Sequence, residues 1–308
     1  MTRSDKPEDL LGISAVERDT GLLKETLRVW ERRYGFPMPQ RDALGERVYP
    51  RAQVERLLQF RRLMDQGWRP GKLMALSEAA LQALLASSAG AAPPPEVTAI
   101  LDTLAARDAV AVRRCLGNRL ARDGLARFVL EYAIPVCVEI GQAWARGDLD
   151  VGQEHLFTEQ LQNCLREAIS QTDIEASRPR ILLTTFPDEQ HTLGLLFAEA
   201  LLAPAGARCS SIGASTPLAD ISRTMLDGDF DVLALSFSAA FPARQALSGL
   251  QELAARLREG SEIWVGSAVL AAKPKALPGV RYLARMEDTL SALETWRDAH
   301  PPAGPAAG

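Results

Sequence analysis

ISAVERDTGL at residues 13–22 and KETLRVWERRY at residues 24–34 are two short helical patterns separated by a turn at Gly21. A glycine between two short helices permits the sharp turn of a helix–turn–helix, which sets its second helix in the major groove of DNA. In the second pattern Lys24, Arg28 and Arg32 recur every fourth residue, on a different face from the apolar Trp30. That basic face can follow a phosphate backbone.

A second basic element follows the helix pair. PMPQR at residues 37–41 and RVY at residues 47–49 flank a short turn, which predicts a wing-like hairpin that contacts phosphates. An ordinary pair of charged helices with solvated arginines is the alternative interpretation. The residues that we expect at a DNA interface are Lys24, Arg28, Arg32, Arg33, Arg41, Arg47 and Tyr49.

Charge is unevenly distributed along the chain. Residues 18–72 hold 13 Lys and Arg against 7 Asp and Glu, whereas the remaining residues hold 22 against 32. A basic first part on an acidic body indicates that only this part meets a polyanion. There is no apolar run of about 18 residues, so no membrane span is expected. The four cysteines form no CxxC pattern and predict free thiols, which favours a cytoplasmic protein.

Composition divides the chain into segments. Residues 1–85 form the predicted DNA-binding domain, and the proline-rich stretch ASSAGAAPPP at 86–95 predicts a linker. Apolar residues recur at three- and four-residue spacing through 96–177, which predicts a wholly helical segment. Residues 178–299 alternate between strand and helix patterns, and 300–308 are expected to be a disordered tail.

The alternating segment predicts an α/β domain. Five short strand patterns lie at residues 181–185, 208–212, 232–236, 263–266 and 280–284. Helical patterns separate them at 192–202, 218–226 and 244–258, and another follows at 288–298. Strands that alternate with helices predict a doubly wound, parallel, five-stranded sheet of the flavodoxin-like kind.

A histidine lies where such a sheet binds ligands. EQHTLG at residues 189–194 follows the first predicted strand, at the carboxyl edge of the sheet. A lone histidine at such a place is more often structural or simply exposed. If His191 were a metal ligand, its other ring nitrogen would need a partner, and Glu189 is the natural one.

The helical segment carries a spaced motif of its own. Trp144 is followed after nine residues by Glu154 and His155, which gives W-x9-E-H. Taken alone, a tryptophan of this kind is more often a core residue, and a Glu-His pair more often lies on the surface.

The order of the N-terminal pieces resembles the winged-helix domain of the MerR family. The resemblance covers roughly residues 11–74: helix–turn–helix, WERRYGFP at 30–37, an arginine-bearing wing, and RVY before a new helix. It implies dimeric binding to a pseudo-palindromic, double-stranded operator. The metal-sensing branch of that family uses cysteines that have no counterpart here.

EQHTLG resembles the acidic-x-His-x-x-Gly pattern of the cobalamin-binding fold shared by methionine synthase and the B12-dependent mutases. The resemblance implies that His191 ligates cobalt and that the displaced base of the cofactor lies beside Gly194. It also implies cofactor contacts from the strand ends, since Ser236-Phe237-Ser238 resembles the Ser-x-Thr/Leu motif of that fold. Gly266-Ser267 stands where the fold usually has two glycines. The implied contacts on these strand ends are Ser236, Ser238 and Gly266.

The whole architecture resembles the CarH/LitR photoreceptor family: MerR domain, linker, four-helix cap, cobalamin domain. The resemblance implies that Trp144, Glu154 and His155 cover the upper face of the corrin and contact the adenosyl group. It further implies a repressor that binds adenosylcobalamin and tetramerises in the dark, and releases DNA when light breaks the cobalt–carbon bond. In the best-known members a histidine follows the tryptophan, where this chain has Ala145.

Three functions remain open on the sequence. The first is the light- and cobalamin-dependent regulator, as a homodimer or homotetramer. The second is a regulator of the same fold that has lost the cofactor and responds to a protein partner or another tetrapyrrole, which Ser267 and Ala145 favour. The third is a cobalamin-dependent enzyme module, against which the winged helix argues. We expect no enzyme, because no nucleophile or general-base constellation is evident.

Overall fold

A computed structural model describes residues 10–42, 44–65, 67–87, 95–172, 178–239 and 241–301. Residues 88–94 of the predicted linker and 302–308 of the predicted tail lie outside this description, as does the side chain of Ala145. By packing, the chain divides into two compact units: residues 1–94 with 139–154, and residues 95–138 with 155–308. None of the described helices combines the length and apolar character that crossing a membrane requires.

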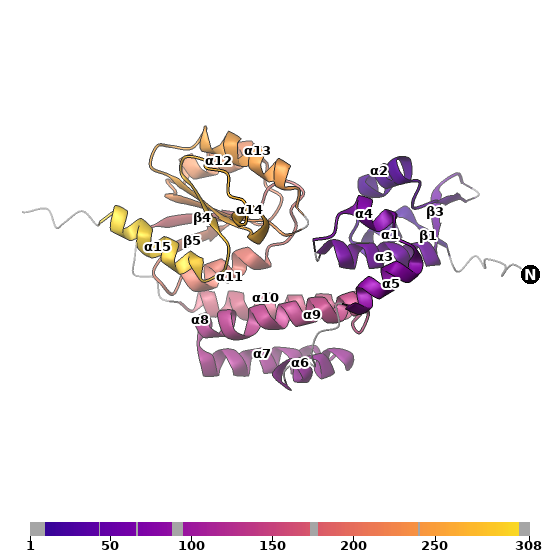
Figure 1. The fold of residues 1–308 in the computed structure, drawn as a ribbon. Coiled ribbons are helices and arrows are strands. Elements are labelled where there is room, and N and C mark those ends of the chain that lie inside the picture. The colour runs from indigo at the N-terminus through magenta and orange to yellow at the C-terminus, as the bar shows by residue number, and fades with distance from the viewer. Residues whose placement is uncertain are drawn as a thin grey trace, which may run out of the picture. The chain divides into compact units, whose positions relative to one another are not determined.

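The first unit contains the predicted winged helix. A short strand β1 (Leu10–Gly12) leads into α1 (Ile13–Thr20) and α2 (Lys24–Tyr34), and a β-hairpin, β2 (Gln40–Arg41) and β3 (Arg47–Pro50), follows. The three strands form an antiparallel sheet in the order β1-β3-β2. Helices α3 (Arg51–Asp65), α4 (Pro70–Met74) and α5 (Glu78–Ser87) complete the domain (Figure 1).

Glycine sets the turn that the helix pair needs. Gly21 ends α1 with φ of 66°, and its backbone N–H donates to the Glu17 carbonyl. That left-handed conformation is easily reached by glycine because it has no Cβ. Leu27 and Trp30 of α2 then pack in a core with Tyr49 of β3 and Phe60 of α3, which confirms the predicted inward face of the second helix.

The segment predicted to be helical, residues 96–177, consists of helices up to residue 170, while residues 173–177 lie outside the described structure. It consists of α6 (Pro95–Ala105), α7 (Ala109–Asp123), α8 (Leu125–Arg127), a π-helical segment η2 (Phe128–Ala133), α9 (Ile134–Arg146) and α10 (Val151–Ser170). Because α8, η2 and α9 follow one another without a break, the segment amounts to four helical rods. Asp108 caps α7 by accepting a hydrogen bond from the backbone N–H of Ala111.

The C-terminal segment forms the predicted parallel sheet. Its strands β4 (Arg180–Thr184), β5 (Arg208–Ser211), β6 (Val232–Ser236), β7 (Glu262–Gly266) and β8 (Val280–Leu283) lie in the order β5-β4-β6-β7-β8. Every neighbouring pair is parallel. This is the flavodoxin-like order, whose switch point lies between the first and third strands, here β4 and β6.

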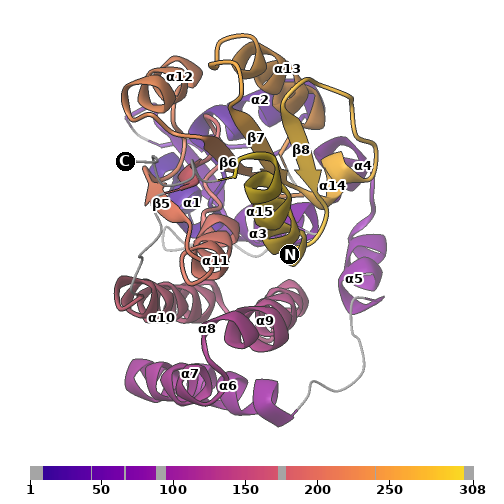
Figure 2. The same cartoon turned by 90° about the vertical axis from the view of Figure 1, so that its left-hand side faces the viewer.

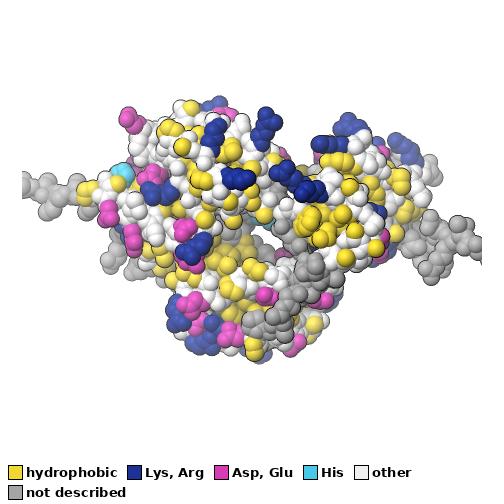
Figure 3. Space-filling view, viewed as in Figure 1, with side chains coloured by type: hydrophobic (Ala, Val, Ile, Leu, Met, Phe, Trp, Pro, Cys, Tyr) yellow, Lys and Arg dark blue, Asp and Glu magenta, His cyan; other side chains and the backbone are white. Residues whose placement is uncertain are grey.

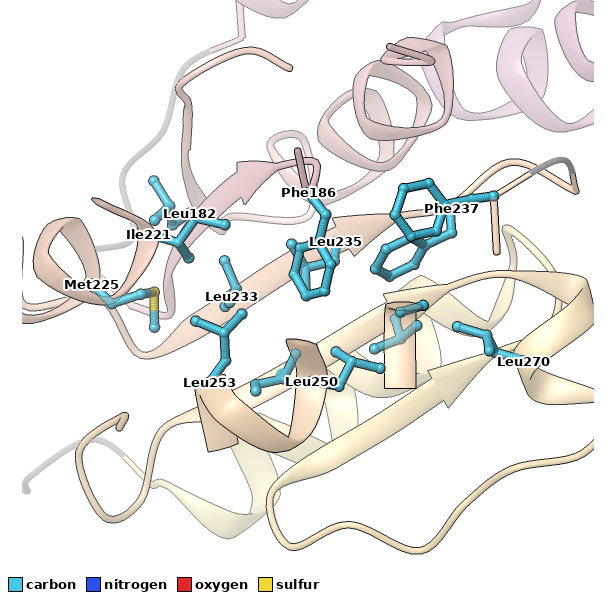
Figure 4. Close-up of a cluster of buried hydrophobic side chains, with 14 of the residues drawn as sticks. Leu182, Phe186, Ile221, Met225, Leu233, Leu235, Phe237, Leu250, Leu253 and Leu270 are labelled. Carbon is cyan, nitrogen blue, oxygen red and sulfur yellow. The ribbon is translucent and has the colours of Figure 1, made fainter. Parts of the chain in front are cut away.

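Helices cover both faces of this sheet. Figure 2 shows α11 (Leu193–Leu202) and α15 (Asp288–Ala299) on one side, and α12 (Leu218–Asp227) and α13 (Ala243–Ala254) on the other. A short α14 (Ala268–Ala271), which the sequence patterns missed, follows β7. On the α12–α13 face Phe186, Phe237 and Leu250 belong to a continuous apolar core (Figure 4). This packing fixes the strand ends that carry the candidate site.

Candidate functional site

The loop after β4 holds a buried carboxylate against a histidine. Glu189 Oε1 lies 2.6 Å from Nδ1 of His191 and also accepts the backbone N–H of His191 at 3.0 Å. The other oxygen, Oε2, accepts both the backbone N–H and the hydroxyl of Ser238, each at 2.8 Å. Glu189 is only 2% exposed, whereas the His191 side chain is 48% exposed. A carboxylate from one strand end thus orients an imidazole that reaches solvent.

The ionisation of Glu189 follows from these contacts. Burial by itself would raise the pKa of its carboxyl group, but hydrogen bonds from His191 and Ser238 outweigh burial and hold the pKa at about 2. The carboxyl group is therefore ionised at neutral pH. An ionised partner keeps the Nδ1 proton of His191 in place, so Nε2 is the nitrogen that would bind a metal.

Ser238, one of the predicted cofactor contacts, donates both its hydroxyl and its backbone N–H to Glu189. Because Ser238 follows β6 and Glu189 follows β4, this contact ties together the two strand ends at the switch point of the sheet. No sequence pattern indicated the pairing, since the two residues are 49 positions apart.

A cavity opens beside this loop. Its volume is about 210 Å³, and its lining includes Gly194, Ser236 and Gly266, three of the predicted cofactor contacts. A Cβ added to Gly194 would lie 2.6 Å from the hydroxyl oxygen of Ser236, so any other residue here would require that hydroxyl to move. At Gly266 an added Cβ would meet only the Leu235 carbonyl oxygen, at 3.5 Å.

Ser267 also lines the cavity, at the position where two glycines were the expected pattern. Its hydroxyl accepts a hydrogen bond from the backbone N–H of Leu270 at 3.4 Å and so caps α14. The polar end of this side chain is used within its own loop. The serine that stands in place of the second glycine therefore adds only one small group to the cavity wall, and that group is already hydrogen-bonded within its own loop.

The helical candidates lie on α9 and α10. In the first unit the guanidinium of Arg62 lies over the Trp144 ring, 5.3 Å from its centroid, and the buried Trp144 Nε1 has no hydrogen-bond partner within the described part of the chain. Burial lowers the pKa of Arg62. Glu154 is half-buried and His155 is exposed on the following position of α10.

The DNA-binding candidates lie on α2 and the hairpin. Arg28, Arg32 and Arg33 are exposed on α2, and Figure 3 shows Lys and Arg side chains in dark blue over this part of the first unit. Lys24 pairs with Glu17 at 3.3 Å. Arg41 is exposed on β2 and donates to the Gly45 carbonyl within the hairpin at 2.6 Å.

The two remaining predicted DNA contacts, Arg47 and Tyr49, lie on β3 and are less exposed than these arginines. Arg47 pairs with Glu31 of α2 at 3.2 Å, which joins the wing to the second helix. Tyr49 is completely buried in the core, on the central strand of the small sheet, so its prediction as a direct DNA contact is wrong. Burial, and then the negative charge of Glu31, raise the pKa of its hydroxyl, which has no hydrogen-bond partner among the described residues.

One positioning residue was missed. Gln53 at the start of α3 accepts the backbone N–H of Met38 at 2.6 Å and donates to its carbonyl at 3.0 Å. These two bonds fix the segment that leads into the wing. A glutamine in a helix gives no sequence signal for such a contact, because its partner lies 15 residues earlier.

Comparison with known proteins agrees with this architecture. The family of MerR HTH regulatory proteins matches residues 11–78, and the family of B12 binding domains matches residues 97–168. The HTH-type transcriptional repressor CarH of Myxococcus xanthus is 32% identical over 262 residues, which are 80% of this chain and 85% of the relative. CarA, an HTH-type transcriptional repressor of the same organism, is 31% identical over 259 residues, 79% of this chain and 81% of the relative.

Among solved structures, the monomethylamine corrinoid protein of Methanosarcina barkeri covers 64% of this chain and 96% of its own. It does so at 12% identity and a TM-score of 0.48, a likeness too weak to bear on function. The relatives that share both domains are regulators rather than enzymes. With the winged helix, the helical segment and the parallel sheet in this order, the chain belongs to the CarH/CarA family of MerR-type regulators that carry a B12-binding domain.

Proposed function

We propose that this regulator is a repressor whose binding to operator DNA is controlled by adenosylcobalamin and by light. The observation that carries the proposal is the arrangement of Glu189, His191 and Ser238 at the carboxyl edge of the sheet. A histidine that binds a metal is held through its other ring nitrogen by a carboxylate or carbonyl, and this loop supplies such a carboxylate.

The residues present fit the cofactor on two further grounds. Because Nδ1 of the exposed imidazole contacts Glu189, Nε2 is the ring nitrogen that would coordinate the cobalt, and the cavity beside it is bounded by Gly194, where a Cβ would displace the Ser236 hydroxyl. Bound adenosylcobalamin would supply a cobalt–carbon bond that visible light cleaves. His191 would ligate the cobalt, Glu189 would hold the Nδ1 proton, and Ser236 would donate its hydroxyl to the displaced base.

The helical residues complete the proposed site. The match to the B12 binding domain family covers Trp144, Glu154 and His155, which supports their role as cofactor contacts. The bulky indole of Trp144 would exclude water from the bound cofactor. Glu154 and His155 would offer hydrogen bonds to the adenosyl group.

The winged helix would bind the operator. The exposed arginines of α2 and the hairpin, Arg28, Arg32, Arg33 and Arg41, would contact phosphates or base edges, while Lys24 would do so after exchanging its contact with Glu17. Arg47, paired with Glu31, would set the angle of the wing and contact phosphate with its remaining donors. We expect a cytoplasmic homodimer or homotetramer.

The experiment that tests the cofactor assignment is titration of His191→Ala with adenosylcobalamin in the dark. The variant is expected to bind far more weakly, or to show the spectrum of cobalamin whose own base stays on the cobalt. His300→Ala is the matched control, because His300 lies in the same unit but stacks on Trp296 instead. Unchanged affinity and spectrum in His191→Ala would refute the assignment.

A second candidate is a regulator of the same fold that does not bind cobalamin. Ser267 in the cavity wall favours it, and so does Ala145, which offers no ligand atom next to Trp144. Visible spectra of the purified protein with adenosylcobalamin, recorded before and after green light, separate the two. A light-dependent spectrum of protein-bound cofactor supports the first candidate, and recovery of all cofactor in the unbound fraction supports the second.

A further inference from the structure

We propose that the cavity between the sheet and α11 selects the chemical class of the cofactor's base. It would accept an apolar bicyclic base of the benzimidazole class and discriminate against a polar purine. Leu202 and Trp264 are the residues that would determine this selectivity. This inference rests on the proposed function, in which the nucleotide tail of a corrinoid enters here.

The side chains that line the cavity become larger with distance from the carboxyl edge of the sheet. In the register of β6 and β7, Ser236 pairs with Gly266 at the edge, and Ala234 pairs with Trp264 two residues deeper. Residues two apart in a strand share a face, and all four of these line the cavity. The sheet wall therefore changes from Ser and Gly at the mouth to Ala and Trp at the inner end.

Helix α11 repeats this gradient on the opposite wall. Gly194, Ala198 and Leu202 all line the cavity and are spaced four residues apart, so they stand above one another on one helix face. Their side chains grow from none at the mouth to an isobutyl group at the inner end. Leu202 is fully buried and Trp264 is 1% exposed, so together they close the cavity.

At the inner end of the cavity, the indole of Trp264 has no hydrogen-bond donor left to offer a ligand. Its Nε1 already donates to Glu262 Oε2 at 2.8 Å, and the ring is left to face the cavity. Of the lining hydroxyls, that of Thr289 is directed to the sulfur of Met286 and that of Ser267 caps α14. Ser236, at the mouth, is the hydroxyl placed to bond a ring nitrogen of an inserted base.

The size of the cavity fits a part of a ligand. At about 210 Å³ it is smaller than the roughly 300–1,000 Å³ of sites that enclose a whole drug-sized molecule. One bicyclic base matches this space better than a macrocycle does. A base with an apolar far edge would contact Leu202 and Trp264, whereas the amino group of a purine would lose its hydrogen bonds to water there. An unpaired buried polar group of this kind weakens binding by roughly ten- to a hundredfold.

The test compares three corrinoids on the full-length protein in the dark. The probes are adenosylcobalamin, the analogue with adenine in place of dimethylbenzimidazole, and adenosylcobinamide, which has no nucleotide. We expect adenosylcobalamin to bind at least about tenfold more tightly than the adenine analogue, because of the unpaired amino group. Equal affinity for these two would overturn the selectivity and leave the proposed function standing. Failure of all three to bind would overturn the proposed function itself.

Two variants assign the selectivity to the inner end. Leu202→Gln adds an amide that can bind the amino group of the purine. The ratio of the dissociation constants for the adenine analogue and for adenosylcobalamin should therefore move toward one. Leu226→Gln, at a 52% exposed position of α12, is the matched control and should keep the ratio of the parent. If folded Leu202→Gln keeps the parental ratio of dissociation constants, this end of the cavity does not determine which base is preferred.

Ala198→Leu keeps the proposal testable if Leu202→Gln does not fold. The added isobutyl group would fill the middle of the cavity without placing a polar atom in it. The affinity for adenosylcobalamin should then fall toward that for adenosylcobinamide, while the affinity for adenosylcobinamide stays unchanged. Undiminished preference for adenosylcobalamin in this variant would mean that the base does not enter the cavity.

Discussion

At the residue scale, the candidate site depends on the carboxylate of Glu189, which both orients His191 and contributes to the stability of the fold. Glu189 receives four hydrogen bonds, two from His191 and two from Ser238, and it is nearly inaccessible to solvent. A buried carboxylate is tolerated only when it is fully paired, so these contacts also stabilise the fold. The same interactions therefore serve ligand orientation and stability.

Glu189→Gln should remove part of the acid sensitivity of the protein. The folded-state pKa of Glu189 is about 2, below its ordinary 4.5, so its ionised form stabilises the fold above pH 4.5. That contribution is lost as the pH falls from 4.5 toward 2, and amounts to on the order of 3 kcal/mol. We expect the variant to be less stable at pH 7 and the difference from the parent to shrink on acidification. Denaturant unfolding of parent and variant at several pH values measures the difference in unfolding free energy. A difference that does not change with pH would contradict the lowered pKa of Glu189.

Arg62→Ala should uncover Trp144. The guanidinium lies 5.3 Å from the ring centroid and contributes about 0.5–2 kcal/mol as a partly buried cation–π contact. In the cofactor-free protein we expect Trp144 to become more accessible to a soluble quencher, with its emission identified by subtracting the spectrum of Trp144→Phe. Arg61→Ala is the control, since Arg61 donates instead to the Gly21 carbonyl. Quenching equal to that of the control would mean that Arg62 does not shield the ring in solution.

At the element scale, the wing and the second helix act together. Arg47 on β3 pairs with Glu31 on α2, and Gln53 on α3 holds the backbone of Met38 before the wing. These contacts fix the spacing between the exposed arginines of α2 and those of the hairpin. DNA binding by this unit therefore depends on some residues that need not touch DNA.

Arg32→Ala combined with Arg41→Ala should weaken operator binding and its dependence on salt. Each phosphate contact contributes about 0.9 to the slope of log affinity against log salt concentration, so losing two should lower it by nearly two. Fluorescence anisotropy over a salt series measures the slope. Arg223→Ala, at an exposed position of α12, should keep the parental slope. The same slope in the double variant would remove both arginines from the interface.

Tyr49→Phe tests the correction made to the predicted interface. The hydroxyl is buried and unpartnered, so its removal deletes no hydrogen bond within the described residues. We expect an unfolding free energy that is not lower than that of the parent and an unchanged affinity for the operator at a fixed salt concentration. A weaker affinity in a variant of parental stability would show that the tyrosine hydroxyl reaches DNA after a rearrangement of the unit.

At the scale of the whole molecule, a single winged helix offers few DNA contacts. Linking several in one assembly raises the effective concentration of each at its half-site, so oligomerisation is an efficient way to control affinity. A cofactor that binds one assembly state more tightly shifts the population toward it. The proposed regulation accordingly predicts coupled changes in assembly and in operator affinity.

The dark protein with adenosylcobalamin should be a larger oligomer than the cofactor-free or the illuminated protein. Size-exclusion chromatography with light scattering on all three samples measures the mass. His191→Ala, treated in the same way, should stay at the mass of the cofactor-free parent. Identical masses in dark, light and cofactor-free samples would leave only the light-independent regulator.

The sequence by itself determined the order of the winged helix, the helical segment and the parallel sheet, and most of the secondary structure. Strand and helix periodicities predicted the parallel sheet because they are local properties of the chain, and EQHTLG marked the candidate site at its carboxyl edge. A histidine with an acidic residue two positions earlier was enough to predict the Glu189–His191 contact. The exact element ends and the short α14 were not predicted, since packing decides where a helix or strand stops.

Only the tertiary structure decided which residues meet across the chain. Ser238 binds Glu189 because β4 and β6 are neighbours in the sheet, although 49 residues separate them. Tyr49 belongs to the core because the central strand of the small sheet directs its ring inward, which its place beside a basic wing did not reveal. The inner end of the cavity likewise exists only where α11 crosses β6 and β7, because Leu202 and Trp264 close it from different elements. Such contacts depend on strand order and helix packing, and no local spacing in the sequence encodes them.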